Sequence, residues 1–447
     1  MPDLSQATQP EIRVTPPGPN AKEVLERDRA YFAQCNSRPY PLVVRRGYNI
    51  WIEDVDDNVY LDCSAGVAVT STGHCHPDVV KRIADQAGNL IHMSGTDFYY
   101  EVEVGLAERL CKLMADHRDY RVFFCNSGTE ANEAGMKLAR FATKRPRLIA
   151  FSGSFHGRTL GSLSMTSSRT VQMEGYFPLL PGVSHFPYPD PYRHPFGGNP
   201  ATVTDDVIRF IADALERYLP PDEVAVVYCE AIQGEGGYIV PPQDFFPKLR
   251  ALCDKHGILI ACDEVQSGVG RTGKMFAHEH VPGFHPDIIT IGKGIASGLP
   301  LGAMIARAEL MKNWGPGRHG STFGGNPVAC AAGLTTMDLI ESKYMQNAAV
   351  TGAHLMAELK HAIGSHPKVG DIRGRGLMLA VDFVTDKTSK QPDATFANQL
   401  ESACYRNGLL ILRAGRSSIR FCPALTISKE QASLAVKIFA ATLKQQG

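Results

Sequence analysis

Between residues 101 and 305, short apolar runs alternate with segments of helical periodicity, and this alternation restricts the fold more than any other feature. Such an order of strands and helices is typical of an α/β fold with a mostly parallel central sheet covered by helices on both faces. Helices are predicted over 101–115, 128–142, 205–218 and 243–256. Strands are predicted over 121–125, 147–151, 224–229, 258–262, 287–291 and 301–305.

Two of these strands end in groups that can act together chemically. One apolar run ends in Asp263-Glu264, and a second one ends in Lys293. Ligands of parallel sheets bind at the carboxyl ends of the strands, so we expect Asp263 and Lys293 at one edge. A carboxylate and an amine there suit an aromatic cofactor, with the lysine forming a Schiff base and the aspartate keeping a ring nitrogen protonated. The alternative is an ordinary Asp and Lys at solvent-facing strand ends, and the two residues alone do not decide.

The segments outside the alternating region predict a second, smaller unit. Short strands before residue 65 form a small meander, and the segment after about 330 combines helices with short strands and a C-terminal helix. We therefore expect an N-terminal arm and meander over 1–65 that packs with the small domain. A large cofactor-binding domain over 66–330 and a small C-terminal α+β domain over 331–447 complete the predicted organisation.

The charge balance argues against several classes of partner. Lys+Arg and Asp+Glu residues number 46 each, without long blocks of one sign, so neither nucleic acid nor an acidic membrane is expected as a partner. No apolar run approaches the ~20 residues of a membrane helix, and the N-terminus lacks an apolar signal core. The 11 cysteines are scattered without a CxxC pair, which indicates free thiols in a reducing, cytoplasmic compartment.

Two further strands are followed by motifs that suit a ligand. Residues 126–132 (Asn-Ser-Gly-Thr-Glu-Ala-Asn) open a helix, whose N–H groups and positive dipole end would hold a phosphate; the alternative is a plain helix cap. After strand 147–151, Phe155 could stack on a planar cofactor and Arg158 could clamp a carboxylate. Taken singly, such a phenylalanine is more often a core residue, and such an arginine is more often a surface residue.

Three other stretches are weaker candidates. Residues 230–237 (Glu-Ala-Ile-Gln-Gly-Glu-Gly-Gly) could place one carboxylate in a cleft or form a flexible, solvated loop. Residues 268–273 match a dinucleotide-binding G-x-G-x-x-G pattern, but no crossover helix or strand-ending acid follows at the required distance, so we reject that reading. His74 and His76 lack neighbouring cysteines or carboxylates at ligand spacing, and no metal site is predicted.

Together these motifs resemble those of the class III aminotransferases, which are pyridoxal-phosphate enzymes of fold type I. The resemblance runs from about residue 40 to the C-terminus and rests on six segments in the family's order and spacing. These are NSGTEAN at 126–132, FHGRT at 155–159, EAIQGEGG at 230–237, DEVQSGVGRTG at 263–273, IGKG at 291–294 and STFGGNP at 321–327.

The resemblance implies a role for each matching residue around the pyridine ring. Lys293 is similar to the Schiff-base lysine that also moves the proton, and Asp263 to the partner of the ring nitrogen. Val265 would pack on the ring, Phe155 would stack on its opposite face, and Gln266 would bond the ring oxygen.

The resemblance also implies how the phosphate is held. Ser127, Gly128 and Thr129 look like the phosphate cradle of the family. Thr322 resembles the threonine that reaches the phosphate of the neighbouring subunit, so the expected assembly is a homodimer or a dimer of dimers.

Four positions would set substrate choice within the family. Arg420 is similar to the arginine that binds an α-carboxylate, and Glu235 to the glutamate that neutralises it when the substrate offers no charge there. Arg158 resembles the arginine that holds a distal carboxylate. Val67 stands where 4-aminobutyrate aminotransferases carry an aliphatic residue and ornithine aminotransferases a tyrosine.

These resemblances predict transfer of an amino group from an ω-amino acid of the 4-aminobutyrate type to 2-oxoglutarate by a ping-pong mechanism. Residues 90–99 and 187–192 look closest to archaeal-type members, which include broad amino-acid racemases. A racemase and an ornithine or acetylornithine aminotransferase are therefore the alternatives on the same scaffold. A catalytically idle pyridoxal-phosphate-binding or metabolite-binding dimer is the alternative from a different class.

Overall fold

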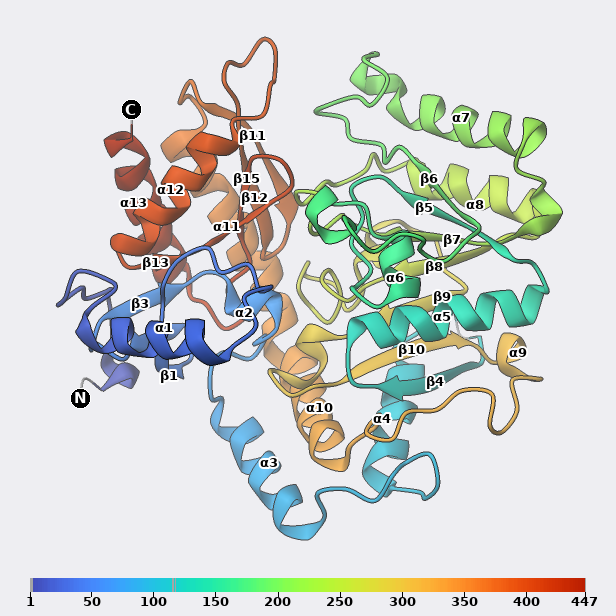
Figure 1. The fold of residues 1–447 in the computed structure, drawn as a ribbon, viewed down its shortest axis with the longest axis horizontal. Coiled ribbons are helices and arrows are strands. Elements are labelled where there is room, and N and C mark those ends of the chain that lie inside the picture. The colour runs from blue at the N-terminus through green and yellow to red at the C-terminus, as the bar shows by residue number, and fades with distance from the viewer. Residues whose placement is uncertain (1–2, 115, 117, 447) are drawn as a thin grey trace.

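The structure, a computed structural model, describes residues 3–114, 116 and 118–446. A seven-stranded sheet forms the centre of the larger lobe, on the right of Figure 1, with the order β4-β10-β9-β8-β7-β5-β6. Its strands are β4 (Tyr120–Cys125), β5 (Arg147–Phe151), β6 (Val183–Phe186), β7 (Val224–Glu230), β8 (Leu259–Asp263), β9 (Ile288–Ile291) and β10 (Gly302–Arg307).

The sheet is mostly parallel, as the sequence predicted. β10 pairs antiparallel with both β4 and β9, whereas the pairs from β9 across β8, β7 and β5 to β6 are parallel. β6 was not predicted, because Val183-Ser184-His185-Phe186 is short and has two polar residues at an edge of the sheet.

Helices cover both faces of this sheet (Figure 1). On β5, Leu148 and Ala150 pack into one hydrophobic cluster and Ile149 and Phe151 into another, because successive side chains of a strand point to opposite faces. The helices of the large lobe are α3 (Pro77–Asn89), α4 (Glu101–Lys112), α5 (Gly128–Thr143), α6 (Leu160–Met165), α7 (Val203–Arg217), α8 (Phe245–His256), α9 (Ala308–Met311) and α10 (Pro327–Leu339).

Helix α5 lies on one face, and α7 and α8 lie on the other. Helix α10 packs against both α3 and α4 below the sheet in Figure 1. The helix predicted over 101–115 ends at Lys112, and residue 115 lies outside the described residues.

The smaller lobe combines the first and the last parts of the chain, so blue and red elements lie together on the left of Figure 1. One sheet has the order β1-β2-β3-β13 and the other has the order β11-β12-β15-β14. Their strands are β1 (Val44–Tyr48), β2 (Trp51–Asp54), β3 (Val59–Asp62), β11 (Val369–Arg375), β12 (Met378–Phe383), β13 (Leu409–Leu410), β14 (Leu412–Ala414) and β15 (Ser418–Phe421). Its helices are α1 (Pro19–Tyr31), α2 (Ala65–Ala68), α11 (Met345–Ile363), α12 (Ala394–Arg406) and α13 (Lys429–Gln445).

The predicted C-terminal helix has a clear local cause, and the predicted meander is tied to the end of the chain. The final helix starts with a capping box, in which the Ser428 and Gln431 side chains each bond the other's backbone N–H. The parallel pairing of β13 with β3 joins the N-terminal meander to the C-terminal unit. The domain boundaries at residues 65 and 330 stay predictions.

Among the described residues, no helix is both long enough and apolar enough to cross a membrane.

Candidate active site

A cavity of about 260 Å³ opens at the carboxyl edge of the seven-stranded sheet. The segments that follow β4, β5 and β9 and the last residues of β7 and β8 supply its walls, and these strands all run in one direction. The lining residues are Ser127, Gly128, Thr129, Asn132, Phe155, His156, Gly157, Arg158, Glu230, Asp263, Val265, Gln266 and Lys293. The motifs predicted at the strand ends therefore meet at one place, as expected for a parallel sheet.

Asp263 is buried in a shell of hydrogen-bond donors. Its Oδ2 accepts from Asn132 Nδ2 at 2.7 Å and contacts His156 Nδ1 at 2.8 Å, and its Oδ1 accepts from Val265 N at 2.9 Å. Burial alone would lower the pKa of His156, but the contact with Asp263 raises it above its ordinary value. Such a shell stabilises an ionised carboxylate, which is the form required to hold a protonated ring nitrogen.

Lys293 lies at the start of the short 3-10 helix η6 (Lys293–Ala296), directly after β9. Its backbone has a φ of +45°, in the left-handed region that residues with a β-carbon rarely adopt. Within the described chain its Nζ has no hydrogen-bond or ion-pair partner. Burial lowers the pKa of Lys293 below its usual value, and the opposing effect of the Glu235 charge is smaller. A lysine of this kind is more easily neutral and hence nucleophilic.

The N-terminus of α5 points its free N–H groups toward the same cavity. Ser127 is the N-cap residue, and Gly128 lies so close to Val265 that an added β-carbon would be 2.6 Å from Val265 Cγ1. The Oγ1 of Thr129 lies 2.6 Å from the Oγ of Ser162. Helix N–H groups and hydroxyls together make an anion site suited to a phosphate.

The carboxylate of Glu133 anchors the hydroxyl groups near the N-terminus of α5. Glu133 Oε1 accepts from Thr159 Oγ1 at 2.5 Å and from Ser162 N at 3.0 Å. Thr159 Oγ1 in turn lies 3.0 Å from Thr129 Oγ1. The hydroxyls of Thr129, Thr159 and Ser162, which we call the hydroxyl cluster, are therefore linked in one network anchored by Glu133.

Phe155 and Val265 supply apolar walls, and Arg158 stands at the cavity mouth. Arg158 is exposed, with its guanidinium carbon 5.6 Å from the centroid of the Phe155 ring. No carboxylate among the described residues pairs with Arg158, so its guanidinium is available to an anionic ligand.

Arg420 on β15 and Glu235 form a buried ion pair beside the cavity. Burial alone would raise the pKa of Glu235, but the charges of Arg420 and Lys293 and the hydrogen bond from Arg420 together hold that pKa below its usual value. Arg420 Nη1 also donates to Gln266 Oε1 at 3.3 Å, and Gln266 lines the cavity. Arg420 Nε is buried without a partner in the described residues, so this donor remains for a further acceptor.

Besides the Glu235–Arg420 pair, two more predicted residues, Val67 and Thr322, do not line the cavity. Val67 is half-buried on α2, where it has a φ of +66°, and α2 packs against the η6 turn that carries Lys293. Thr322 is exposed on the segment before α10. The position of Thr322 leaves its hydroxyl accessible to a second molecule.

Four residues of the cavity were not among the predicted site residues, although each lies inside a quoted motif: Asn132, His156, Gly157 and Glu230. Asn132 and His156 hold Asp263, and Glu230 accepts from Gly234 N at 2.9 Å. Burial raises the pKa of Glu230 to about 7. The available signal for Asn132, His156 and Gly157 was their position one helical turn or one residue from predicted site residues. For Glu230 it was the position at the end of a strand.

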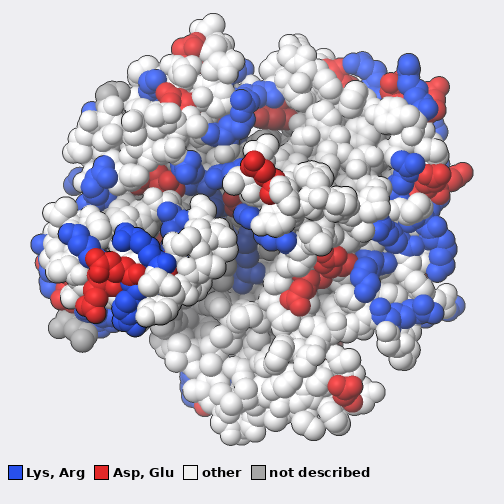
Figure 2. Space-filling view, in the orientation of Figure 1, with Lys and Arg blue, Asp and Glu red and all other residues white. Residues whose placement is uncertain are grey.

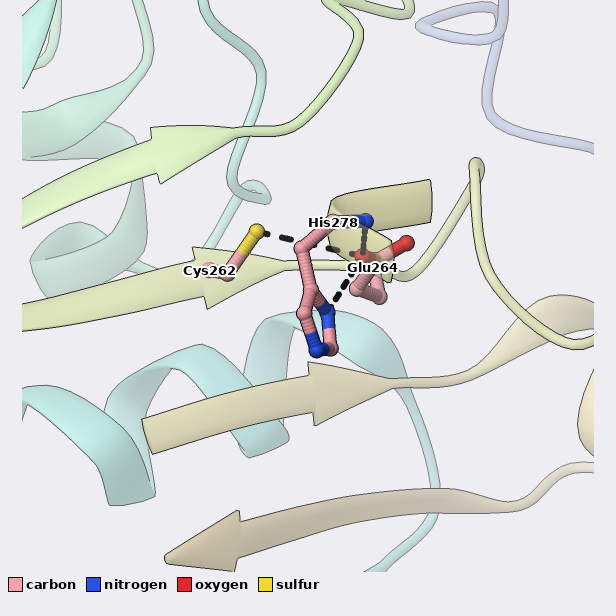
Figure 3. A group of neighbouring side chains, drawn as sticks. All are labelled: Cys262, Glu264 and His278. Carbon is pink, nitrogen blue, oxygen red and sulfur yellow. Dashed lines mark hydrogen bonds and ion pairs between the residues drawn. The ribbon is translucent and has the colours of Figure 1, made fainter. Parts of the chain in front are cut away.

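Cys262, Glu264 and His278 form the only group of three metal-ligand side chains found within the described residues (Figure 3). The Glu264 carboxylate already accepts from Ser267 Oγ at 2.7 Å, from Ala277 N at 2.9 Å and from His278 N at 2.8 Å. Since protein donors occupy this carboxylate, the group is better explained as a structural contact that holds residues 277–278 against the end of β8 than as a metal site.

The two histidines with a possible metal role bond elsewhere. His74 Nε2 lies 2.8 Å from Asp62 Oδ2, and His76 Nε2 lies 3.0 Å from the Tyr344 hydroxyl.

The groups in the cavity fit a phosphorylated pyridine. A helix N-terminus with a hydroxyl cluster suits the phosphate, and Phe155 and Val265 suit the flat ring. Asp263 suits the ring nitrogen, and the unpaired amine of Lys293 suits an aldehyde carbon.

The comparisons with known proteins agree with this fit. The family model described as aminotransferase class-III matches residues 32–443. The chain is 38% identical over 444 residues to the alanine/serine racemase of Pyrococcus horikoshii, covering 97% of this chain and 93% of that protein. It is 38% identical to the acetylornithine aminotransferase of Corynebacterium efficiens, covering 91% of this chain and 93% of that protein.

A solved structure is similar over nearly the whole chain. The pyridoxal-phosphate-bound amine transaminase from an uncultivated Pseudomonas species superposes with a TM-score of 0.86 at 34% identity. The match covers 91% of this chain and 95% of that one.

Proposed function

The chain belongs to the class III aminotransferase family and uses pyridoxal phosphate, and from this premise we propose that it transfers an amino group from an ω-amino acid of the 4-aminobutyrate type to 2-oxoglutarate. The reaction would follow a ping-pong cycle, in which glutamate forms in the second half.

The Glu235–Arg420 ion pair is the observation that carries this proposal. An unpaired arginine in a buried site is costly, so Glu235 neutralises Arg420 when the bound substrate has no α-carboxylate. When glutamate or 2-oxoglutarate binds, its α-carboxylate replaces Glu235 as the partner of Arg420. One site thereby accepts two substrates that differ by a charge at this point.

The residues around the cavity would divide the chemistry among them. Bound pyridoxal phosphate supplies an electron sink for the substrate carbon that loses its proton. Lys293 would hold the cofactor covalently and carry the proton between two carbons through its Nζ, which burial keeps easily deprotonated. Asp263 would keep the ring nitrogen protonated, held in place by Asn132 and His156.

The remaining substrate contacts concern the far end of the molecule. Arg158 would clamp the distal carboxylate of glutamate with its planar guanidinium. Figure 2 shows Lys and Arg side chains in the hollow between the two lobes, where they attract dicarboxylates. Val67 would leave room that a tyrosine would fill, which favours 4-aminobutyrate over ornithine.

We also propose that the enzyme works as a homodimer or a dimer of dimers. The exposed Thr322 would reach the cofactor phosphate of the neighbouring subunit. Large apolar side chains are exposed near this segment, among them Ile91, Phe98 and Phe323, and such a surface favours association. The cysteines are free thiols, which supports a cytoplasmic location.

A donor panel tests the proposed reaction. The purified enzyme is mixed with 4-aminobutyrate, ornithine or acetylornithine, with 2-oxoglutarate or pyruvate as acceptor, and glutamate or alanine formation is measured. We expect the highest kcat/KM for 4-aminobutyrate with 2-oxoglutarate. A higher value with acetylornithine would assign the enzyme to that neighbouring activity.

A racemase is the second candidate, because the alanine/serine racemase of Pyrococcus horikoshii is as similar as any relative named above. In that reaction Lys293 returns the proton to the opposite face of the carbon, and no keto acid is consumed. Incubation with single L-amino acids in the absence of a keto acid decides the question. Accumulation of the D-enantiomer over many turnovers would eliminate the transaminase proposal.

A further inference from the structure

Tyr238 occupies a strained position between the two lobes. It is fully buried, and its backbone has a φ of +57°, directly after Gly237 with a φ of +120°. An aromatic residue in the left-handed region is disfavoured, and such conformations persist only where the surrounding structure holds them. The position of Tyr238 three residues after Glu235 places this strain beside the Glu235–Arg420 pair.

The hydroxyl of Tyr238 is bound to Gln266. Tyr238 Oη lies 2.8 Å from Gln266 Oε1, and Arg420 Nη1 lies 3.3 Å from the same atom. A guanidinium can only donate, so the Gln266 atom that faces Arg420 must be the amide oxygen. Tyr238 therefore donates to that oxygen, and the orientation of the amide is fixed by two donors.

This orientation leaves the amide nitrogen of Gln266 for the cavity. Gln266 lines the cavity, and its Nε2 has no hydrogen-bond partner among the residues that the structure describes. A β-carbon at Gly234 would lie 2.5 Å from this nitrogen, so any residue other than glycine at 234 would collide with the Gln266 amide. Two N–H donors thus remain for an oxygen of the bound cofactor.

We propose that Tyr238 is a positioning residue that couples the carboxylate-binding Arg420 to the cofactor ring through Gln266. The hydroxyl holds the amide oxygen against Arg420 in both half-reactions, whether Glu235 or a substrate carboxylate is the other partner of the arginine. It thereby keeps the Gln266 nitrogen directed at the ring oxygen. This inference rests on the proposed function in assigning Arg420 to the α-carboxylate.

The ring of Tyr238 has a separate packing role. It belongs to a small hydrophobic cluster with Ala68, Ile232, Met378 and Cys422, which includes residues of both lobes. Phenylalanine would keep this packing and remove only the hydroxyl. The Tyr238→Phe variant therefore separates the positioning role from the structural one.

The test compares the Tyr238→Phe holoenzyme with the wild type and with Tyr60→Phe. Tyr60 is a matched control, since it is also fully buried and its hydroxyl contacts Asp54 Oδ2 at 3.0 Å in the N-terminal sheet. The first measurement is the pH midpoint at which the visible absorption of the bound cofactor changes. Loss of one oriented donor disfavours the anionic ring oxygen, so we expect this midpoint to rise by about half a pH unit, equivalent to about a three-fold weaker interaction.

The second measurement follows each half-reaction separately in single turnovers. We expect Tyr238→Phe to lower the rate of both half-reactions by about 3- to 10-fold and to raise the KM for glutamate, with Tyr60→Phe unchanged. A pH midpoint and rates equal to those of the wild type would overturn the proposal.

A double-mutant cycle shows whether Tyr238 acts through Gln266. In a Gln266→Met background, Tyr238→Phe should cause no further change in midpoint or rate. Additive effects would overturn the proposal even if the single variant lost stability. The pH titration needs no substrate, so it still tests Tyr238 if the wild type converts neither 4-aminobutyrate nor glutamate and the proposed function fails.

Discussion

At the scale of single residues, the site contains both paired and unpaired charges. Lys293 and Arg158 have no ion-pair partner in the described part of the chain, whereas Arg420 is paired with Glu235. Unpaired cations next to a cavity are available to bind a cofactor or an anionic substrate directly. The paired arginine must instead exchange one carboxylate for another, and this exchange makes Glu235 the residue that distinguishes the two substrates.

We expect Glu235→Ala to affect the two half-reactions unequally. Without Glu235 the buried Arg420 lacks a counter-charge when 4-aminobutyrate is bound, but not when glutamate supplies its α-carboxylate. The rate constant of the 4-aminobutyrate half-reaction should fall about 10- to 100-fold, and that of the glutamate half-reaction by less than about 3-fold. Stopped-flow measurement of each half-reaction checks this, and equal losses would contradict the switch.

Glu230 makes a pH-dependent contribution to stability. Burial raises its pKa from the ordinary value of 4.5 to about 7 in the folded protein, so its contribution is fully present below pH 4.5 and is lost as pH rises through 7. Glu230→Gln removes this titration. In the cofactor-free protein, the Tm of the variant relative to the wild type should increase between pH 5 and pH 8. A difference in Tm that stays constant with pH would contradict the raised pKa.

At the scale of secondary-structure elements, the phosphate end of the site depends on close approach between α5 and the turn before α6. Gly157 in that turn has a φ of +132°, and a β-carbon there would lie 2.1 Å from Thr129 Oγ1 and 2.5 Å from Ser162 Oγ. Both the backbone conformation and the missing side chain are therefore required for the hydroxyl cluster. The turn brings Thr129 of α5 into contact with Thr159 and Ser162 at the start of α6.

Gly157→Ala should weaken cofactor binding by at least about 10-fold, because the added methyl group displaces the hydroxyl cluster. Gly175→Ala is the matched control, since Gly175 also has a positive φ, of +82°, but nothing lies within 4 Å of the added β-carbon. Titration of cofactor-free protein with pyridoxal phosphate, followed by fluorescence, gives the dissociation constants. Equal weakening in both variants would assign the effect to backbone strain alone.

The sequence predicted the elements whose local signal is strong. The strand that ends at Asp263 and the helix capped by Ser428 combine apolar periodicity with a polar stop or a cap. The edge strand β6 and the strand β11 were missed, since Ser184, His185 and the Arg–Gly alternation of residues 369–375 give no apolar pattern. Their strand conformation comes from pairing with neighbours in the sheet, which no local pattern encodes.

The same limit applies to the candidate site. The resemblance led to Asp263, Lys293 and the residues around them, and the structure brings these into one cavity. Local pattern did not reveal that Tyr238 reaches Gln266, because that contact joins residues 28 positions apart through a strained turn. A contact between two loops that follow different strands carries no signal within either segment.

At the scale of the whole molecule, exposed apolar side chains gather near the helices α3, α4 and α10. Ile91, Phe98 and Phe323 are 64%, 51% and 62% exposed, and Ile91 and Phe323 line a cavity of about 540 Å³. Solvent contact with such a surface is unfavourable, and a second copy of the chain would remove it. Thr322, next to Phe323, would then be delivered to the neighbouring site.

Phe323→Asp should convert the proposed dimer into a monomer, because a charge in the centre of an apolar interface is left unpaired. Turnover should fall more than about 10-fold when Thr322 no longer reaches a second site. Tyr218→Asp is the control, since Tyr218 is similarly exposed, at 64%, at the end of α7. Sedimentation and activity are measured together, and a monomer with full turnover would contradict a shared site.

The parallel pairing of β13 with β3 has a consequence for how the protein is made. Leu61 and Leu409 are neighbours in one sheet. At a translation rate of about 5–20 residues per second, roughly 350 residues separate the emergence of these strands from the ribosome, which corresponds to about 20–70 seconds. During that interval the edge of β3 at Leu61 and Asp62 is unpaired, so the nascent chain needs protection from aggregation until β13 has been synthesised.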